Sequence, residues 1–183
     1  MERVDDVFAD VEKSLEKYRS VESMKCNLFE KGDAWEAASI EVVSGLTDIL
    51  KNISSKPESE GFEKAELTKR FSEFVDMISN RENGVLWGFA SQAKGGKVLI
   101  SFLKELAADK KFVPQIDKIF RSGSGNYPLV NRISCDYEDK FNELFSKLPE
   151  DYQNKLLGET ISYEEGDKTY TCSLIGGTAL MGF

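Results

Sequence analysis

Residues 33–53, DAWEAASIEVVSGLTDILKNI, contain the pattern that decides the fold class. Apolar residues recur there at steps of three and four, a spacing that places them on one face of an α-helix. Asp33 is a good N-cap with Glu36 as its capping-box partner, and Gly32-Asp33 is expected to separate this helix from the preceding segment. The predicted buried face consists of Trp35, Ala38, Val42, Leu46, Ile49, Leu50 and Ile53.

The same spacing predicts helices on both sides of this segment. An amphipathic helix covers residues 4–18, and a polar linker around Pro57 separates residues 33–53 from the next helix. That helix spans residues 62–78 and is expected to stop at Asn83-Gly84, a left-handed C-cap. Further helices are predicted over residues 98–106, after Pro114, from an N-cap at Asp136 to Leu148, and from Pro149 to Gly158, with a loop at 122–128.

The C-terminal part of the chain has a different pattern. Residues 160–163 and 169–174 alternate with period two and are rich in β-branched and aromatic types, which predicts a β-hairpin over 159–175 with a turn at Glu164–Asp167. A lone hairpin is marginal in water, so we expect it to dock on the helices or to pair with another chain. We expect residues 176–183 to form a flexible or tucked tail. The predicted fold is mainly α, one domain over residues 1–183: a compact bundle of about six to seven helices with a C-terminal β-hairpin.

Charge and composition limit the partners. The chain has 24 Lys and Arg against 32 Asp and Glu, and its net charge of −8 disfavours binding to nucleic acid and favours a basic protein partner. The alternative is that the charge only keeps the protein soluble. No segment is long and apolar enough to span a membrane. Three separated cysteines and the acidic N-terminus favour a cytoplasmic protein, or an exported one whose signal has been removed. A monomer and a homodimer are both compatible with the sequence.

The chain contains no histidine, which excludes nucleophilic sites that use an imidazole base and most catalytic zinc sites. Gly95-Gly96-Lys97 does not match a phosphate-binding loop, since Ser91 and Val98 stand at two required positions, and a helix-capping turn is favoured there. We therefore predict no catalytic residue, no metal site and no cofactor.

The most unusual local feature is the apolar run 84–89, in which Trp87 and Phe89 flank a glycine. Tryptophan is common at binding hot spots, so Val85, Trp87 and Phe89 are the candidate binding residues, the alternative being that Trp87 fills the core. The run is similar to the first homology region of Bcl-2-like proteins. Leu86 and Phe89 replace the asparagine and the arginine of that motif, and a C-terminal hairpin has no place in that fold, so membership is not inferred.

These features favour a non-enzymatic protein-binding helical domain of a sequestering, immunity-type or effector-like kind, for a basic or amphipathic partner. A small carboxylate-dependent hydrolase is an alternative, with Glu164 or Glu165 facing Asp136, Glu138 or Asp139. A helical carrier of an apolar ligand is another, and it would need an enclosed cavity among the phenylalanines.

Overall fold

The computed structural model describes residues 4–25, 28–57, 61–80, 85–86, 93–122, 128–165 and 168–175. Within them the chain is mainly helical and ends in a two-stranded antiparallel hairpin, which confirms the predicted fold class. The helices are α1 (Val4–Ser20), α2 (Leu28–Ser55), α3 (Gly61–Ser79), α5 (Ala93–Leu106), α6 (Val113–Arg121), α7 (Leu129–Asp136), α8 (Glu138–Phe145) and α9 (Glu150–Gly158). The other elements are the 3-10 turns η1 (Val21–Ser23) and η4 (Lys110–Phe112) and the strands β1 (Thr160–Glu165) and β2 (Lys168–Ser173).

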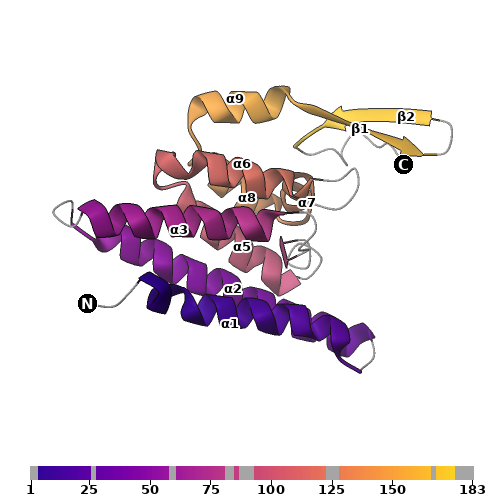
Figure 1. The fold of residues 1–183 in the computed structure, drawn as a ribbon. Coiled ribbons are helices and arrows are strands. Elements are labelled where there is room, and N and C mark those ends of the chain that lie inside the picture. Colours follow the sequence, from indigo (N-terminus) through magenta and orange to yellow (C-terminus); the bar gives the residue numbers. More distant parts are fainter. Residues whose placement is uncertain are drawn as a thin grey trace.

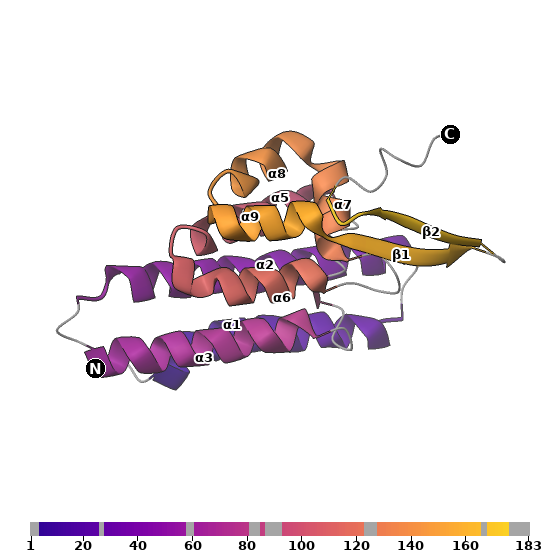
Figure 2. The ribbon, with the colours of Figure 1, turned by 90° about the horizontal axis from the view of Figure 1, so that it is seen from above.

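The helices pack in layers that begin with the three longest. Helix α2 contacts α1, α3 and α5, and α6 packs on α3 and α5. Figure 1 shows α9 and the hairpin on the side of the molecule farthest from α1. Seen from above, the hairpin extends past the ends of α6 and α9 (Figure 2). The outer part of the hairpin therefore projects from the helical body.

One cluster of buried apolar side chains runs from Phe8 in α1 to Leu174 just after β2. Aromatic rings join the layers, because Phe71 of α3 lies 6.3 Å from the ring of Phe102 in α5 and 5.5 Å from that of Phe112. Burial of these rings is the main stabilising term, since each removes a large apolar area from water. None of the helices in the described ranges combines the length and apolar character that crossing a membrane requires.

The predicted break at Gly32-Asp33 is wrong, because α2 continues without interruption from Leu28 to Ser55. A glycine inside a helix costs only about 1 kcal/mol, and the tertiary packing of a long helix offsets this. The Glu36 carboxylate accepts a hydrogen bond of 3.0 Å from the backbone N–H of Gly95. Glu36 therefore caps the first turn of α5, far away in the sequence.

The predicted capping turn at Gly95-Gly96 also differs from the structure, since both glycines lie inside the first turns of α5. A Cβ added to Gly96 would overlap the ring of Tyr137. The glycine thus permits a close approach between α5 and the junction of α7 and α8. Local helix propensity gives no sign of this contact, because Tyr137 is distant in the sequence.

Asp136 does not begin a helix, as the sequence suggested, but ends one. Residues 129–136 form α7 after Pro128, and Tyr137 interrupts the helical backbone with φ −139° and ψ 44° before α8 starts. The Asp136 carboxylate pairs with Arg132 one turn earlier at 3.4 Å. This additional helix brings the described part of the chain to eight α-helices, above the predicted six to seven.

Several other boundaries agree with the sequence. Helix α1, the linker after Ser55, α6 around Pro114 and α9 after Pro149 were all predicted. Helix α3 ends at Ser79, before the predicted stop, and Asn83-Gly84 lies outside the described residues. Most of the predicted loop at 122–128 and the tail at 176–183 also lie outside them.

The hairpin spans residues 160–173 and is held to the helices at its base. Its register pairs Ile161 with Cys172 and Glu165 with Lys168, so both strands continue further toward the turn than predicted. Leu174 is 2% exposed, and its carbonyl accepts a hydrogen bond of 3.3 Å from the side-chain amide of Asn131 in α7. The expectation that the hairpin docks on the helices is met at this end.

Candidate functional site

The binding residues predicted from the sequence are only partly described. Val85 has no exposed surface and neighbours Leu86, which is also buried, so Val85 belongs to the core. Trp87 and Phe89 lie outside the described residues. A binding surface at Trp87 and Phe89 stays a prediction, and Val85 is not part of its accessible area.

A pocket between α1 and α3 is the candidate site that the structure adds. Its volume is about 410 Å³, within the range of pockets that take a small ligand or a few side chains. The floor is apolar and consists of Leu15, Phe74 and Met77. The rim is charged and consists of Glu12, Glu16, Arg19, Arg70 and Glu73.

Helical spacing explains why these residues meet. The α1 residues lie three, four and seven positions after Glu12, and the α3 residues have the same relation to Arg70. Each set therefore occupies one face of its helix. Phe8 of α1 stacks on Phe74 of α3 with ring centroids 5.6 Å apart, which holds the two faces beside each other.

The charged groups of the rim are paired weakly. Arg70 Nη2 donates to Glu12 Oε1 at 3.0 Å, and Arg70 Nη1 lies 4.0 Å from Glu73 Oε2. All three side chains are about half exposed, and exposed ion pairs contribute only about 0–1 kcal/mol. Glu16 has no ion-pair partner among the described residues. The rim can therefore exchange its contacts for those of a binding partner at low cost.

The floor is well suited to an apolar side chain of variable shape. Leu15 and Phe74 are buried, and Met77 is partly buried with its sulfur 4.0 Å from Arg19 Nη2. Methionine is flexible and polarizable, so it adapts to different neighbours. Arg19 and Met77 contact each other at the mouth of the pocket, so their side chains can move without disturbing the core.

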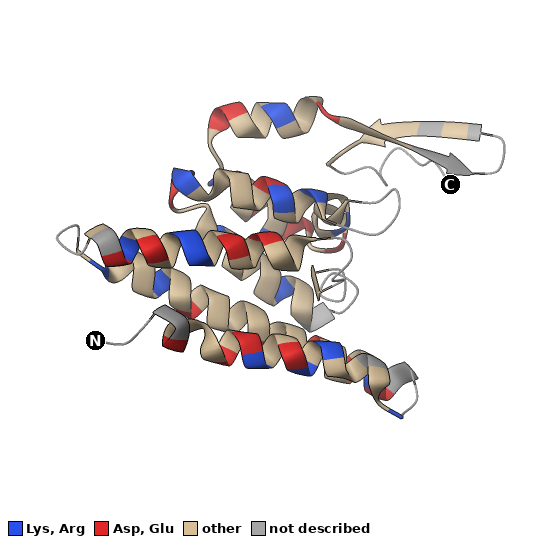
Figure 3. Cartoon of the chain, viewed as in Figure 1, with Lys and Arg blue, Asp and Glu red and all other residues tan. Residues whose placement is uncertain are grey.

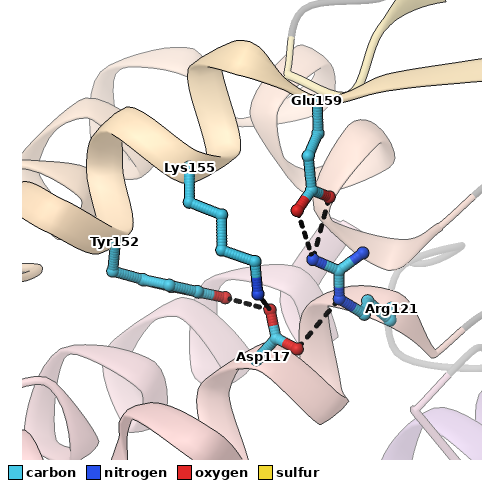
Figure 4. A network of polar contacts seen from close by, with 5 residues as sticks. All are labelled: Asp117, Arg121, Tyr152, Lys155 and Glu159. Atoms are coloured by element: carbon cyan, nitrogen blue, oxygen red, sulfur yellow. Dashed lines mark hydrogen bonds and ion pairs between the residues drawn. The ribbon is translucent and has the colours of Figure 1, made fainter.

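A second polar cluster joins α6 to α9 and to the start of β1 (Figure 4). Asp117 accepts a hydrogen bond of 2.9 Å from Arg121 Nε and one of 3.0 Å from the Tyr152 hydroxyl. Arg121 Nη2 in turn lies 2.8 Å from Glu159, and Lys155 Nζ lies 3.4 Å from Asp117. The cluster acts as a polar clamp between α6, α9 and Glu159, the residue that connects α9 to β1.

The pKa values of this clamp show which groups are charged. Burial alone would raise the pKa of Asp117, but the hydrogen bonds from Arg121 and Tyr152 and the nearby positive charges outweigh it and lower the pKa. Burial and the negative charge of Asp117 raise the pKa of Tyr152. At neutral pH Asp117 is ionised and Tyr152 is protonated, so Asp117 does not have the raised pKa that a general acid needs.

The backbone positions of the residues proposed for a hydrolase lie in different parts of the described structure. Glu164 and Glu165 end β1 at the outer end of the hairpin, which points away from α8 (Figure 2). Glu138 and Asp139 are exposed in the first turn of α8. Among the described residues, no group of three or more metal-binding side chains comes together.

The phenylalanines proposed to line a ligand cavity contact one another directly. Besides the rings around Phe71, Phe120 lies 6.2 Å from Phe141, and Phe141 lies 5.9 Å from Phe145. These distances are typical of packed aromatic pairs. These rings are part of the packed core, and the carrier hypothesis stays a prediction.

No protein-family model, curated protein or solved structure matches this chain. The pocket between α1 and α3 was missed in the sequence because its two halves lie far apart in the chain. The only local signal is that each half combines charged and apolar residues at the spacing of one helix face.

Proposed function

We propose that this chain is a helical protein-binding domain that takes an amphipathic helix of its partner on the surface between α1 and α3. The observation that carries the proposal is the pocket with an apolar floor and a rim of weakly paired charges. Helix-in-groove recognition uses this combination: an apolar anchor enters the groove, and charged residues on both sides set the orientation.

The rim indicates the charge of the partner. Three of its five charged residues are glutamates, and Glu16 has no ion-pair partner among the described residues. A partner helix with one large apolar residue flanked by Lys or Arg would fill the floor and pair with Glu16 and Glu73. The net charge of −8 would also accelerate the approach of a basic protein. We propose a protein partner, not nucleic acid, and a cytoplasmic site of action.

Affinity capture from native lysate, with the wild type and three variants, tests this proposal. Glu16→Lys combined with Met77→Asp alters the rim and the floor at half-buried or exposed positions. Glu66→Lys, on an exposed part of α3 that does not line the pocket, is the matched control. We expect one basic protein to be captured by the wild type and by Glu66→Lys, and to be lost in the double variant.

Trp87→Ala completes the comparison. If the partner is lost in Trp87→Ala but kept in the double variant, the binding surface is the one predicted from the sequence, and the pocket proposal is wrong. Retention of the partner by all variants would contradict both sites. Circular dichroism of each purified variant shows whether a loss of binding reflects unfolding.

A further inference from the structure

We propose that the cavity between α2, α3 and the connection from α5 to α6 binds a small, multiply charged phosphate. This cavity has a volume of about 770 Å³. It lies at the end of the bundle where α2 finishes and α3 begins, and none of its lining residues belongs to the pocket between α1 and α3. The inference is therefore independent of the proposed protein partner.

The cavity gathers positive charge in an acidic protein. Lys51 comes from α2, Lys64 from α3, and Lys110 and Lys111 from η4. Two carboxylates, Glu105 and Asp109, share the lining. Lysines from three separate elements converge on one concave region, an arrangement in which several ammonium groups can contact one anion.

One of the two carboxylates, Asp109, is paired within the cavity, and Glu105 has no ion pair among the described residues. Asp109 accepts a hydrogen bond of 3.1 Å from the backbone N–H of Lys111 and lies 2.8 Å from Lys111 Nζ. Burial would raise the pKa of Asp109, but the contacts with Lys111 and the charge of Lys64 lower it. A carboxylate placed among these residues is thus stabilised in its negative form, as a bound phosphate would be.

The carboxyl end of α2, which carries the negative end of the helix dipole, has side-chain donors at its carbonyls. The hydroxyls of Ser54 and Ser55 donate to the carbonyls of Leu50 and Asn52, each at 2.9 Å. Lys64 Nζ donates to the carbonyl of Lys56 at 3.2 Å. The two hydroxyls add donors to the carbonyls of the last turn, and the Lys64 ammonium offsets part of the negative end of the helix dipole.

Two lysines are most available to a ligand. Lys110 is exposed and has no ion-pair partner among the described residues, and Lys51 has only a long contact of 3.8 Å with the exposed Asp48. Leu50 and Ala108 add apolar surface to the lining. A ligand that combines phosphate groups with a small organic part would use both kinds of surface.

The size of the ligand follows from the distribution of charge. At physiological ionic strength, charges more than about 8 Å apart are largely screened from one another. An anion that fits inside the cavity therefore responds to the nearby lysines more than to the net charge of −8. A nucleic acid would extend over the acidic surface outside it and be repelled.

Isothermal titration calorimetry with inorganic pyrophosphate and the full chain tests the site. The variant Lys51→Gln with Lys110→Gln removes two cavity charges. The control, Lys13→Gln with Lys69→Gln, removes two charges from exposed positions outside the cavity. We expect binding of one pyrophosphate per chain, weakened roughly tenfold in the cavity variant and less than about twofold in the control.

Absence of pyrophosphate binding to the wild type, or equal weakening in both variants, would overturn the proposal. A parallel titration with a nucleoside diphosphate distinguishes a phosphate ester from a free phosphate as the ligand of the cavity. Tighter binding than pyrophosphate identifies a phosphate ester that also contacts Leu50 and Ala108, and equal binding identifies free phosphate groups as sufficient.

Discussion

The Asp117 carboxylate contacts side chains on two helices, and no sequence motif indicated this role. It contacts Arg121 on its own helix and Tyr152 and Lys155 on α9. Helical spacing explains the contact with Arg121, but Tyr152 and Lys155 are too far from Asp117 in the sequence for their contacts to be predicted from spacing. The contact arises because α9 lies alongside α6, so that the Tyr152 hydroxyl points toward the Asp117 carboxylate (Figure 4).

Asp117→Asn should reduce the free energy of unfolding at pH 7 by about 1–2 kcal/mol, because a partly buried charged hydrogen-bond acceptor is lost. The folded-state pKa of Asp117 is lowered, so its contribution is present above the unfolded-state pKa and disappears as the pH falls through the folded-state pKa. Urea unfolding of both proteins at pH 7 and pH 3 should therefore show a smaller difference at pH 3.

The control for this experiment is Asp136→Asn, which removes a half-exposed partner of Arg132. It should cost less than about 0.5 kcal/mol at either pH. An Asp117→Asn penalty that is the same at pH 7 and pH 3 would contradict the assignment of Asp117 as the charged centre of the clamp.

At the scale of elements, the hairpin depends on its attachment to the helices. Two strands alone are marginal in water, and the described contacts of this hairpin with the body are at its base. Leu174 is buried there, and its backbone N–H donates to the Glu159 carbonyl at 2.9 Å. The base therefore determines whether the whole hairpin stays formed.

Leu174→Ala should cost about 2–4 kcal/mol and release the hairpin before the helices unfold. Hydrogen–deuterium exchange should show faster exchange across β1 and β2, with little change in α1 and α2. Leu157→Ala on α9 is the control, because Leu157 is 59% exposed and should have little effect. Unchanged exchange in β1 and β2 would show that the hairpin is stable without this contact.

The sequence predicted the elements whose signals are local. Amphipathic spacing located α1, α3 and α6, and Pro114 in the first turn of α6 and Pro149 before α9 marked the starts of these two helices. At Gly32 and at Gly95-Gly96, glycines that usually break helices lie inside helices, and at Gly95-Gly96 distant residues, Glu36 and Tyr137, lie against the glycines. The pocket between α1 and α3 could not be predicted for a related reason, because it requires the relative position of two helices.

At the scale of the whole molecule, one core connects all layers. The buried cluster includes residues of α1 and α2, of α5 and α6, and Leu174 beyond the hairpin. Domains with one continuous core usually unfold in a single cooperative transition. The charged residues do not form a single region in the same way. Acidic and basic residues alternate over α1 and α3 (Figure 3).

We expect urea unfolding followed by far-ultraviolet and by near-ultraviolet circular dichroism to give coincident midpoints. Phe102→Leu, in a ring contact between α3 and α5, should lower both midpoints together by an amount equivalent to about 1–2 kcal/mol. Separate midpoints in the wild type would show that the long helices and the C-terminal layer are two independent units.

The hydrogen bond between Glu36 and Gly95 joins residues 59 positions apart, and this separation has a kinetic consequence. Two adjacent glycines make the start of α5 a poor nucleus, so that turn is completed only after a long loop has closed against α2. The bond is then absent from the rate-limiting transition state. Loss of the Glu36 carboxylate would therefore accelerate unfolding while leaving the refolding rate almost unchanged.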